Sequence, residues 1–288
     1  MSVDTATRPD VVADTRPEPW RLYDVTVARV ERLSPTFLRV TFVGDDLDDF
    51  ASGGLDQRIK LVLPAAEGGY GHLVRGGDWY TAWRALPEEH RCVLRTYTVR
   101  SVRGGIPGLP AEVDVDFALH GETGPAARWA LAARPGDQVV VMGPNGRHGG
   151  PYGGIEFTPG AGADTFLVVG DETATPAVSA ILEHLATRAA DGHAVKGEVL
   201  LEVPCADDVL DLVVPTGVTL TWVVRDGAPT ASASSRSCRP RPPASSTAAA
   251  AARSPGGRHR RRAPVGGSRR RRRLAARADR PAVRLARR

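Results

Sequence analysis

The chain has 288 residues, of which 42% are apolar, enough for the cores of two domains of ordinary size. Its net charge of +5 averages two unlike segments: residues 231–288 hold 18 Arg, no Lys and one acidic residue, a net of +17, so the first 230 residues carry −12. This acidic body excludes a general affinity for nucleic acid. No apolar run in the sequence approaches the roughly 20 residues that span a bilayer.

The cysteines and the N-terminus indicate a reducing compartment. Cys92, Cys205 and Cys238 have neither metal-ligand spacing nor an evident disulfide framework. Residues 1–19 are polar and lack the apolar segment of a signal peptide. We therefore expect a flexible leader at 1–19 and a cytoplasmic protein, with no membrane association and no metal site.

Short strands separated by turns follow the leader, because apolar and polar residues alternate in several short runs. These strands are expected at residues 23–30, 37–43, 58–64, 92–102, 113–120 and 138–142. Many short strands with little helix predict a small antiparallel barrel. We expect this barrel domain to span residues 20–160.

The pattern changes after Gly162, where a continuous apolar run is typical of a buried parallel strand. A helix is predicted at 176–190. Strands are predicted at residues 165–169, 198–203 and 219–224. Strand, helix and strand in this order begin a nucleotide-binding α/β layer, and three strands are too few to complete one. We therefore expect a truncated α/β domain at 161–230.

From about Ala231 onward the chain is almost all Ala, Arg, Ser, Pro and Gly, without an aromatic residue. Such a segment buries too little apolar surface to fold, so residues 231–288 are expected to be disordered. Two interpretations stay open. One is a genuine basic tail that binds nucleic acid through phosphates, although no stacking aromatics are interleaved. The other is a frame-shifted end, since Arg without Lys beside Ala, Pro and Gly is what GC-rich DNA encodes in the wrong frame.

The stretch with the most chemical content is Arg95–Arg100, which reads Arg-Thr-Tyr-Thr-Val-Arg. On a strand, Arg95 and Tyr97 share one face. A guanidinium pairs with phosphate through two hydrogen bonds, and an aromatic ring covers a planar ligand. This strand is therefore a candidate site for a planar, phosphorylated molecule, with an ordinary half-exposed strand as the alternative.

A second candidate follows the strand at 113–120. Gly124-Pro125 leads directly into a helix expected at 126–134, which Pro135-Gly136 ends. Free backbone N–H groups and the positive end of the helix dipole make such a terminus an anion site.

Three motifs occur in order: Arg95-Thr-Tyr-Thr98, His120-Gly-Glu-Thr-Gly-Pro-Ala126 and Gly170-Asp-Glu-Thr-Ala174. Together they resemble the siderophore-interacting protein family, whose members are flavin-dependent ferric-siderophore reductases related to ferredoxin–NADP reductases. The resemblance covers about Trp20–Gly227. It implies a ferredoxin-reductase-like FAD-binding antiparallel barrel, followed here by an incomplete NAD(P)-binding parallel sheet and a disordered basic tail.

The resemblance implies an oxidoreductase that takes electrons from NAD(P)H through FAD to a ferric siderophore and releases Fe(II), with no catalytic acid, base or nucleophile. The residues that it implies for FAD and NAD(P)H are Arg95, Tyr97, Thr98, His120, Gly121, Gly124, Pro125, Ala126, Gly170, Asp171, Glu172 and Thr173. It implies Lys60 and Arg128 for the anionic ferric siderophore. The alternatives are a structural role for His120 and ordinary surface charges at Lys60 and Arg128.

This sequence departs from the family at its C-terminal end. The family has a late strand with a Trp-x-x-Gly-Glu-like segment and a terminal aromatic and basic stretch, and neither is present here. The alternative function is therefore a flavin- or siderophore-binding module without turnover. We expect the protein to be a monomer.

Overall fold

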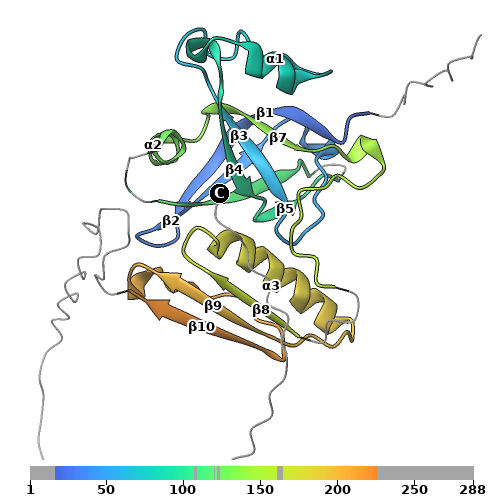
Figure 1. The fold of residues 1–288 in the computed structure, drawn as a ribbon, viewed down its shortest axis with the longest axis vertical. Coiled ribbons are helices and arrows are strands. Elements are labelled where there is room, and N and C mark those ends of the chain that lie inside the picture. The colour runs from blue at the N-terminus through green and yellow to red at the C-terminus, as the bar shows by residue number, and fades with distance from the viewer. Residues whose placement is uncertain (1–16, 107–108, 120, 122–123, 161–164, 226–288) are drawn as a thin grey trace, which may run out of the picture. The chain divides into compact units, whose positions relative to one another are not determined.

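The computed structural model describes residues 17–106, 109–119, 121, 124–160 and 165–225. The expectations for residues 1–16, for His120 and for the tail at 231–288 lie outside the described residues. Within them, the strands form one antiparallel sheet of seven strands and one parallel sheet of three (Figure 1). The strands of the first sheet are β1 (Trp20–Arg32), β2 (Phe37–Val43), β3 (Arg58–Leu63), β4 (Val93–Thr98), β5 (Ser101–Arg103), β6 (Glu112–Ala118) and β7 (Gln138–Pro144).

The seven-stranded sheet is closed by the chain itself. Its order is β4-β3-β7-β1-β2-β6-β5, so its two edge strands, β4 and β5, are consecutive in the chain. Only Val99 and Arg100 separate them. The N–H of Val99 donates to the carbonyl of Gln57 at 2.9 Å, and the N–H of Arg100 donates to the carbonyl of Asp114 on β6 at 2.8 Å. The expected antiparallel barrel is confirmed, and the single strand expected at 92–102 is two strands because the chain crosses between sheet edges there.

The barrel interior is apolar. Tyr23, Phe42 and Phe117 are at most 1% exposed and pack with aliphatic side chains from β1, β2, β3, β6 and β7. Fully burying each large side chain stabilises the fold by roughly 1.5–3 kcal/mol. The hydroxyl of Tyr23 donates to the carbonyl of Pro144 at 2.8 Å, so its burial leaves no polar atom without a partner.

Two helices belong to the barrel part of the chain, α1 (Trp79–Ala85) and α2 (Pro125–Ala132). The sequence did not predict α1, because it has only seven residues and follows a glycine-rich loop. Asp78 starts it by accepting a hydrogen bond from the N–H of Thr81 at 3.2 Å. The helix expected at 126–134 is α2, which begins at Pro125 and ends earlier because Ala133 leaves the helical conformation, with ψ of 137°.

The parallel sheet consists of β8 (Phe166–Gly170), β9 (Gly197–Val203) and β10 (Val218–Val224), in the order β10-β9-β8, and α3 (Thr175–Ala190) packs on it. Ile181 and Leu182 of α3 form a buried cluster with Val199 and Leu201 of β9. Val169 and Val223, on the opposite face, are 50% and 42% exposed. Since parallel sheets are normally covered on both faces, the described part of this layer is one-sided.

Short helical turns connect several elements: η1 (Leu47–Asp49), η2 (Glu88–His90), η3 (Gly146–His148) and η4 (Ala206–Asp208). The last residues of the expected leader are hydrogen-bonded to Asn145, the residue before η3. The side-chain amide of Asn145 donates to the carbonyl of Glu18 at 2.8 Å, and its backbone N–H donates to that of Pro19 at 2.9 Å. None of the helices in the described ranges is long and apolar enough to cross a membrane.

Asp114 on β6 is a buried carboxylate that is 2% exposed. It accepts hydrogen bonds from the hydroxyls of Thr41 at 2.7 Å and Ser101 at 2.9 Å, and from the guanidinium of Arg103. Burial by itself raises the pKa of such a carboxyl. Here the three donors outweigh burial and lower the pKa of Asp114 from 3.8 to about 2.

We expect Asp114 to make the stability of the barrel sensitive to acid. A folded pKa below the unfolded value means that the unfolded chain binds the proton more tightly. The stabilisation is therefore present above about pH 4 and is lost as the pH falls towards 2. Its size is about 2 kcal/mol. Urea unfolding from pH 6 to pH 2 should show a shallower loss of stability for Asp114→Asn than for the wild type, whereas the exposed control Asp45→Asn keeps the wild-type slope. An unchanged slope for Asp114→Asn would contradict the assignment.

Candidate functional site

Strand β4 carries a cation that is open to a ligand. Arg95 is exposed, and its Nη1 donates to the carbonyl of Leu94 at 2.9 Å. Within the described part of the chain no carboxylate pairs with this guanidinium, in contrast to the arginines of β1, β2 and β5. An unpaired guanidinium on a rigid strand can take a phosphate through two parallel hydrogen bonds.

Tyr97 lies on the same face of β4 as Arg95. The strand register places Tyr97 opposite Ile59 and Arg95 opposite Leu61, both of which are core residues. The Tyr97 ring is half-buried, with its centroid 4.4 Å from that of Phe117 and the two planes at 46°. Burial raises the pKa of Tyr97 to about 12, although nearby Arg95 lowers it slightly. Tyr97 is thus an uncharged, fixed aromatic surface beside a cation, and Thr98 ends the strand.

The N-cap residue of α2 leaves its N-terminus without a side-chain cap. This residue is Gly124, which is in extended conformation and has no side chain to accept a hydrogen bond from the first turn. A Cβ atom on Gly124 would meet no described atom within 4 Å, so the approach to this terminus is open. Gly121 has φ of +74°, which favours glycine, and Ala126 is buried against the barrel core. Within the described residues, the first N–H groups of α2 thus form a candidate site for an anion.

These features fit FAD. The group would bring two phosphates, a ribityl chain and a planar ring system, and the described residues offer an unpaired guanidinium, an open helix N-terminus and an aromatic face. His120, also predicted to contact the flavin, lies outside the described residues. Among the residues that the structure describes, no group of three or more His, Cys, Asp and Glu could hold a metal ion.

The two residues predicted for the siderophore lie on different elements. Lys60 on β3 donates through Nζ to the hydroxyl of Thr96 at 2.6 Å, on the face of the sheet opposite to that of Tyr97. Burial, and then the charge of Arg58, lower the pKa of Lys60. Arg128 is exposed on α2. Their substrate role stays a prediction.

The predicted NAD(P)H loop connects β8 to α3 at the carboxyl end of the parallel sheet, where open α/β sheets bind ligands. Gly170 is required there, because a Cβ atom would lie 2.5 Å from the Cβ of Ala174. Asp171 accepts hydrogen bonds from the N–H of Thr173 at 3.0 Å and from its hydroxyl. The loop is therefore a tight turn with its side chains ordered by one another.

Glu172 of this loop pairs with a residue that the sequence did not single out. The Glu172 side chain is 5% exposed, and both of its oxygens accept hydrogen bonds from Arg225, at 2.7 and 2.8 Å. Arg225 also contacts Glu202 of β9 at 2.7 Å. Arg225 directly follows β10, and carboxyl ends of parallel strands meet at one edge of a sheet, which is the signal that could have found it.

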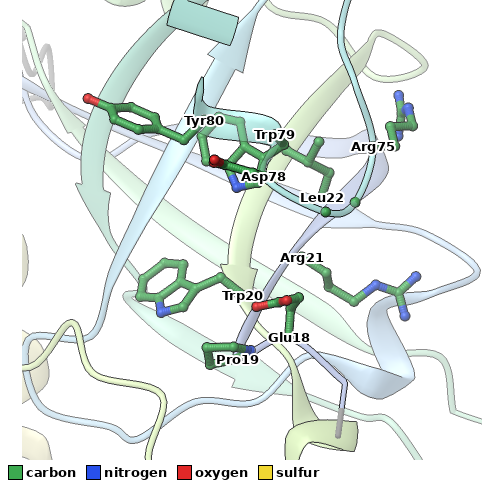
Figure 2. Close-up of a pocket in the computed structure, with 11 residues that line it drawn as sticks. Glu18, Pro19, Trp20, Arg21, Leu22, Arg75, Asp78, Trp79 and Tyr80 are labelled. Carbon is green, nitrogen blue, oxygen red and sulfur yellow. The ribbon is translucent and has the colours of Figure 1, made fainter. Parts of the chain in front are cut away.

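A pocket of about 590 Å³ lies elsewhere on the barrel, between β1 and the segment that leads into α1 (Figure 2). Trp20, Trp79 and Tyr80 are among its aromatic lining residues. Its cations are neutralised, since Arg21 pairs with Asp46 at 2.8 Å and Arg75 pairs with Asp24 at 2.7 Å. None of the predicted site residues lines this pocket, so it is a feature separate from them.

Two family models match the chain. Residues 26–148 match the model described as the siderophore-interacting FAD-binding domain, and residues 163–249 match the model described as siderophore-interacting protein. The first match contains β4 and the start of α2, and the second contains the loop between β8 and α3. The second match extends past Gly227, the residue at which the resemblance inferred from the sequence motifs ends.

Individual relatives agree with these models. The ferric vibriobactin reductase ViuB of Vibrio cholerae is 37% identical over 199 residues, which make up 69% of this chain and 65% of that protein. The NADPH-dependent ferric-chelate reductase of Escherichia coli is 36% identical over 132 residues, 44% of this chain and 46% of that protein. The crystal structure of the siderophore-interacting protein SipS from Aeromonas hydrophila is 35% identical, covers 71% of this chain and 68% of that one, and gives a TM-score of 0.52. The chain thus spans a little under two thirds of the length of the vibriobactin reductase.

Proposed function

Because this chain belongs to the siderophore-interacting protein family, we propose that it reduces ferric siderophores with electrons from NAD(P)H, through FAD bound to its FAD-binding domain. The observation that carries the proposal is that two side chains lie on one face of β4: Arg95, with which no described carboxylate forms an ion pair, and the half-buried ring of Tyr97. Relatives named as a ferric vibriobactin reductase and a ferric-chelate reductase support it.

The chain's own residues bind and orient in this proposal. FAD, when bound, supplies the exchange between a two-electron hydride donor and a one-electron iron acceptor. Arg95 would pair with a phosphate, the first-turn N–H groups of α2 would hold the pyrophosphate, and Tyr97 would cover the ring or ribityl region. Thr98 would provide a hydroxyl to the ring system. Iron leaves a hard oxygen ligand set more easily as Fe(II) than as Fe(III), so reduction releases it.

The electron donor is proposed to bind at the loop between β8 and α3. The helix N-terminus there would face its phosphates, and Gly170 lets the strand and helix approach closely. Glu172 is engaged by Arg225, so Asp171 and Thr173 at the exposed side of the loop are the better candidates for direct contact. The proposed donor is a cytoplasmic metabolite. We therefore propose that the reaction takes place in the cytoplasm, and that the protein acts as a monomer.

Lys60 and Arg128 are proposed to attract the ferric siderophore. Its ligand oxygens are commonly anionic, and the first 230 residues of this chain carry a net charge of −12, so local cations are needed to offset repulsion. Lys60 lies on β3, and its ammonium group donates to the hydroxyl of Thr96 on β4, the strand that carries Arg95.

Purified protein is expected to be yellow, to be bleached by NADH or NADPH without oxygen, and to regain its colour when a ferric chelate is added. Absorbance near the flavin bands follows both steps, and an Fe(II)-specific chelator measures the product. A protein that gains no flavin spectrum when FAD is added would contradict the proposal. Flavin that binds but is not bleached by either dinucleotide would favour a binding module without turnover, for which the exposed face of the parallel sheet in the described residues is the supporting observation.

A further inference from the structure

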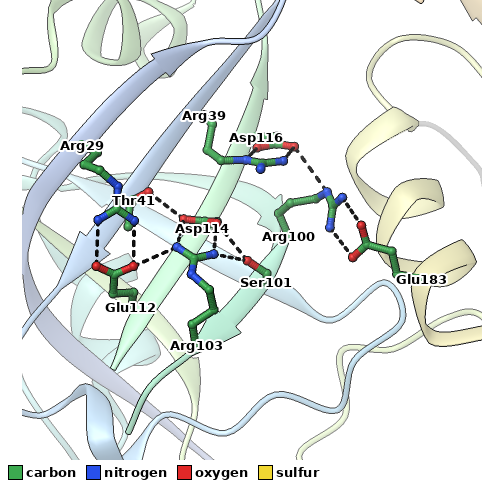
Figure 3. A network of polar contacts seen from close by, with 10 residues as sticks. All are labelled: Arg29, Arg39, Thr41, Arg100, Ser101, Arg103, Glu112, Asp114, Asp116 and Glu183. Carbon is green, nitrogen blue, oxygen red and sulfur yellow. Dashed lines mark hydrogen bonds and ion pairs between the residues drawn. The ribbon is translucent and has the colours of Figure 1, made fainter. Parts of the chain in front are cut away.

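Arg100 ties the strand that carries the flavin candidates to α3. It lies two residues after Thr98, and its side chain is 11% exposed. The guanidinium donates to the carboxylate of Glu183 on α3, with Nη1 2.7 Å from Oε2, and lies 3.5 Å from the carboxylate of Asp116 on β6 (Figure 3). One side chain therefore contacts both the barrel and the helix that packs on the parallel sheet.

The barrel end of this contact is held in place by further ion pairs. Glu112, Asp114 and Asp116 alternate along β6, so they share one face of the sheet. Each pairs with an arginine from a neighbouring strand, as Figure 3 shows. Asp116 is 4% exposed and accepts two hydrogen bonds from Arg39, at 2.7 and 2.8 Å. Arg39 thus fixes the Asp116 carboxylate independently of Arg100. Among the arginines drawn in Figure 3, only Arg100 contacts α3.

A second contact joins the same two parts of the chain. Asp208 of η4, between β9 and β10, is fully buried. It accepts hydrogen bonds from the hydroxyl of Ser34 at 2.7 Å and from the N–H and hydroxyl of Thr36 at 2.8 and 2.9 Å, all in the turn between β1 and β2. A single contact leaves rotation about itself free. The pair Arg100–Glu183 supplies a second point, and that point restricts the rotation.

We propose that Arg100 is a positioning residue for the reduction of the flavin by NAD(P)H. This inference rests on the proposed function. With Glu183 it holds the layer that carries the dinucleotide loop at a fixed place relative to β4. In the proposed hydride step NAD(P)H would be oxidised to NAD(P)⁺ and bound FAD would be reduced by two electrons, and this requires the reacting atoms to approach to about 3–3.5 Å. A misplacement of about 1 Å slows such a step by about 100-fold. In this proposal the later electron transfer from the flavin to the ferric chelate does not depend on the placement of α3.

The discriminating variant is Glu183→Gln, because it removes one charge at constant size and leaves Arg100 paired with Asp116. At saturating NAD(P)H, stopped-flow absorbance should show bleaching slowed by about 10-fold or more. FAD affinity and the rate of reoxidation by a ferric chelate should stay at wild-type values. Glu112→Gln is the matched control. It removes a carboxylate from the same group of ion pairs on β6; this carboxylate accepts hydrogen bonds from Arg29 and Arg103 and does not contact α3. It should leave both half-reactions unchanged.

A readout that needs no flavin separates this inference from the proposed function. In the full-length apoprotein, hydrogen exchange of the α3 amides should be faster in Glu183→Gln, with exchange in β2 and β6 unchanged. Glu183 is 39% exposed, so 1 M NaCl should screen its pair and speed α3 exchange in the wild type but not in the variant. A wild type that binds FAD but is not bleached contradicts the proposed function. Unchanged α3 exchange in Glu183→Gln overturns the inference, and so does bleaching at the wild-type rate.

Discussion

Arg95→Ala is expected to weaken the binding of FAD by about 100-fold. The guanidinium is the one candidate on β4 that can make two charge-assisted hydrogen bonds to a phosphate, and in the described structure it has no competing carboxylate. Removing one partner of such a charged pair costs about 2–5 kcal/mol, and each 1.4 kcal/mol is a tenfold change in affinity. Titration of apoprotein with FAD, followed by quenching of flavin fluorescence, measures the effect.

Two further variants make this test specific. Arg95→Lys keeps the charge and loses the planar fork, so its affinity should lie between those of the wild type and Arg95→Ala. Arg84→Ala removes an exposed arginine from α1 and should bind FAD as the wild type does. Because Arg95 is exposed, all three variants should unfold at temperatures near that of the wild type. Wild-type FAD affinity in Arg95→Ala would remove Arg95 from the site.

Asp208→Ala is expected to lower the free energy of unfolding by about 3–5 kcal/mol. The carboxylate is fully buried and accepts hydrogen bonds from three donors of the turn between β1 and β2, and the Sγ of Cys205 lies 3.1 Å from it. Its removal leaves the donors of Ser34 and Thr36 buried without an acceptor, and each such group costs about 1–3 kcal/mol. Urea unfolding followed by circular dichroism measures the difference.

The controls for Asp208 lie beside it. Asp207→Ala removes an exposed carboxylate from the same turn and should change stability by less than about 0.5 kcal/mol. Ser34→Ala removes one donor and should cost about 1 kcal/mol, which remains measurable if Asp208→Ala does not fold, since total stability is of the order of 5–15 kcal/mol. A loss below 1 kcal/mol in Asp208→Ala would show that the two parts of the chain are not held at this point.

The sequence by itself determined many of the local elements and which side chains of β4 share a face. Side chains alternate strictly along a strand, so Arg95 and Tyr97 had to share a face wherever β4 lay in the fold. Gly124 and Pro125 likewise set the start of α2, because proline fits the first helical turn and carries no N–H group to satisfy. The βα loop at Gly170 was predictable for the same reason: its determinants lie within a few residues of one another.

Only the tertiary structure decided which distant residues meet. Arg100 was expected inside one strand at 92–102, yet the chain crosses between sheet edges there and turns its guanidinium to Glu183. Asp208 meets Ser34 across 174 residues, and Arg225 meets Glu172 because three parallel strands end at one edge. A carboxylate or a guanidinium has many possible partners along a chain. Its choice follows from sheet order and strand register, which depend on burial of the whole core rather than on local conformational preference.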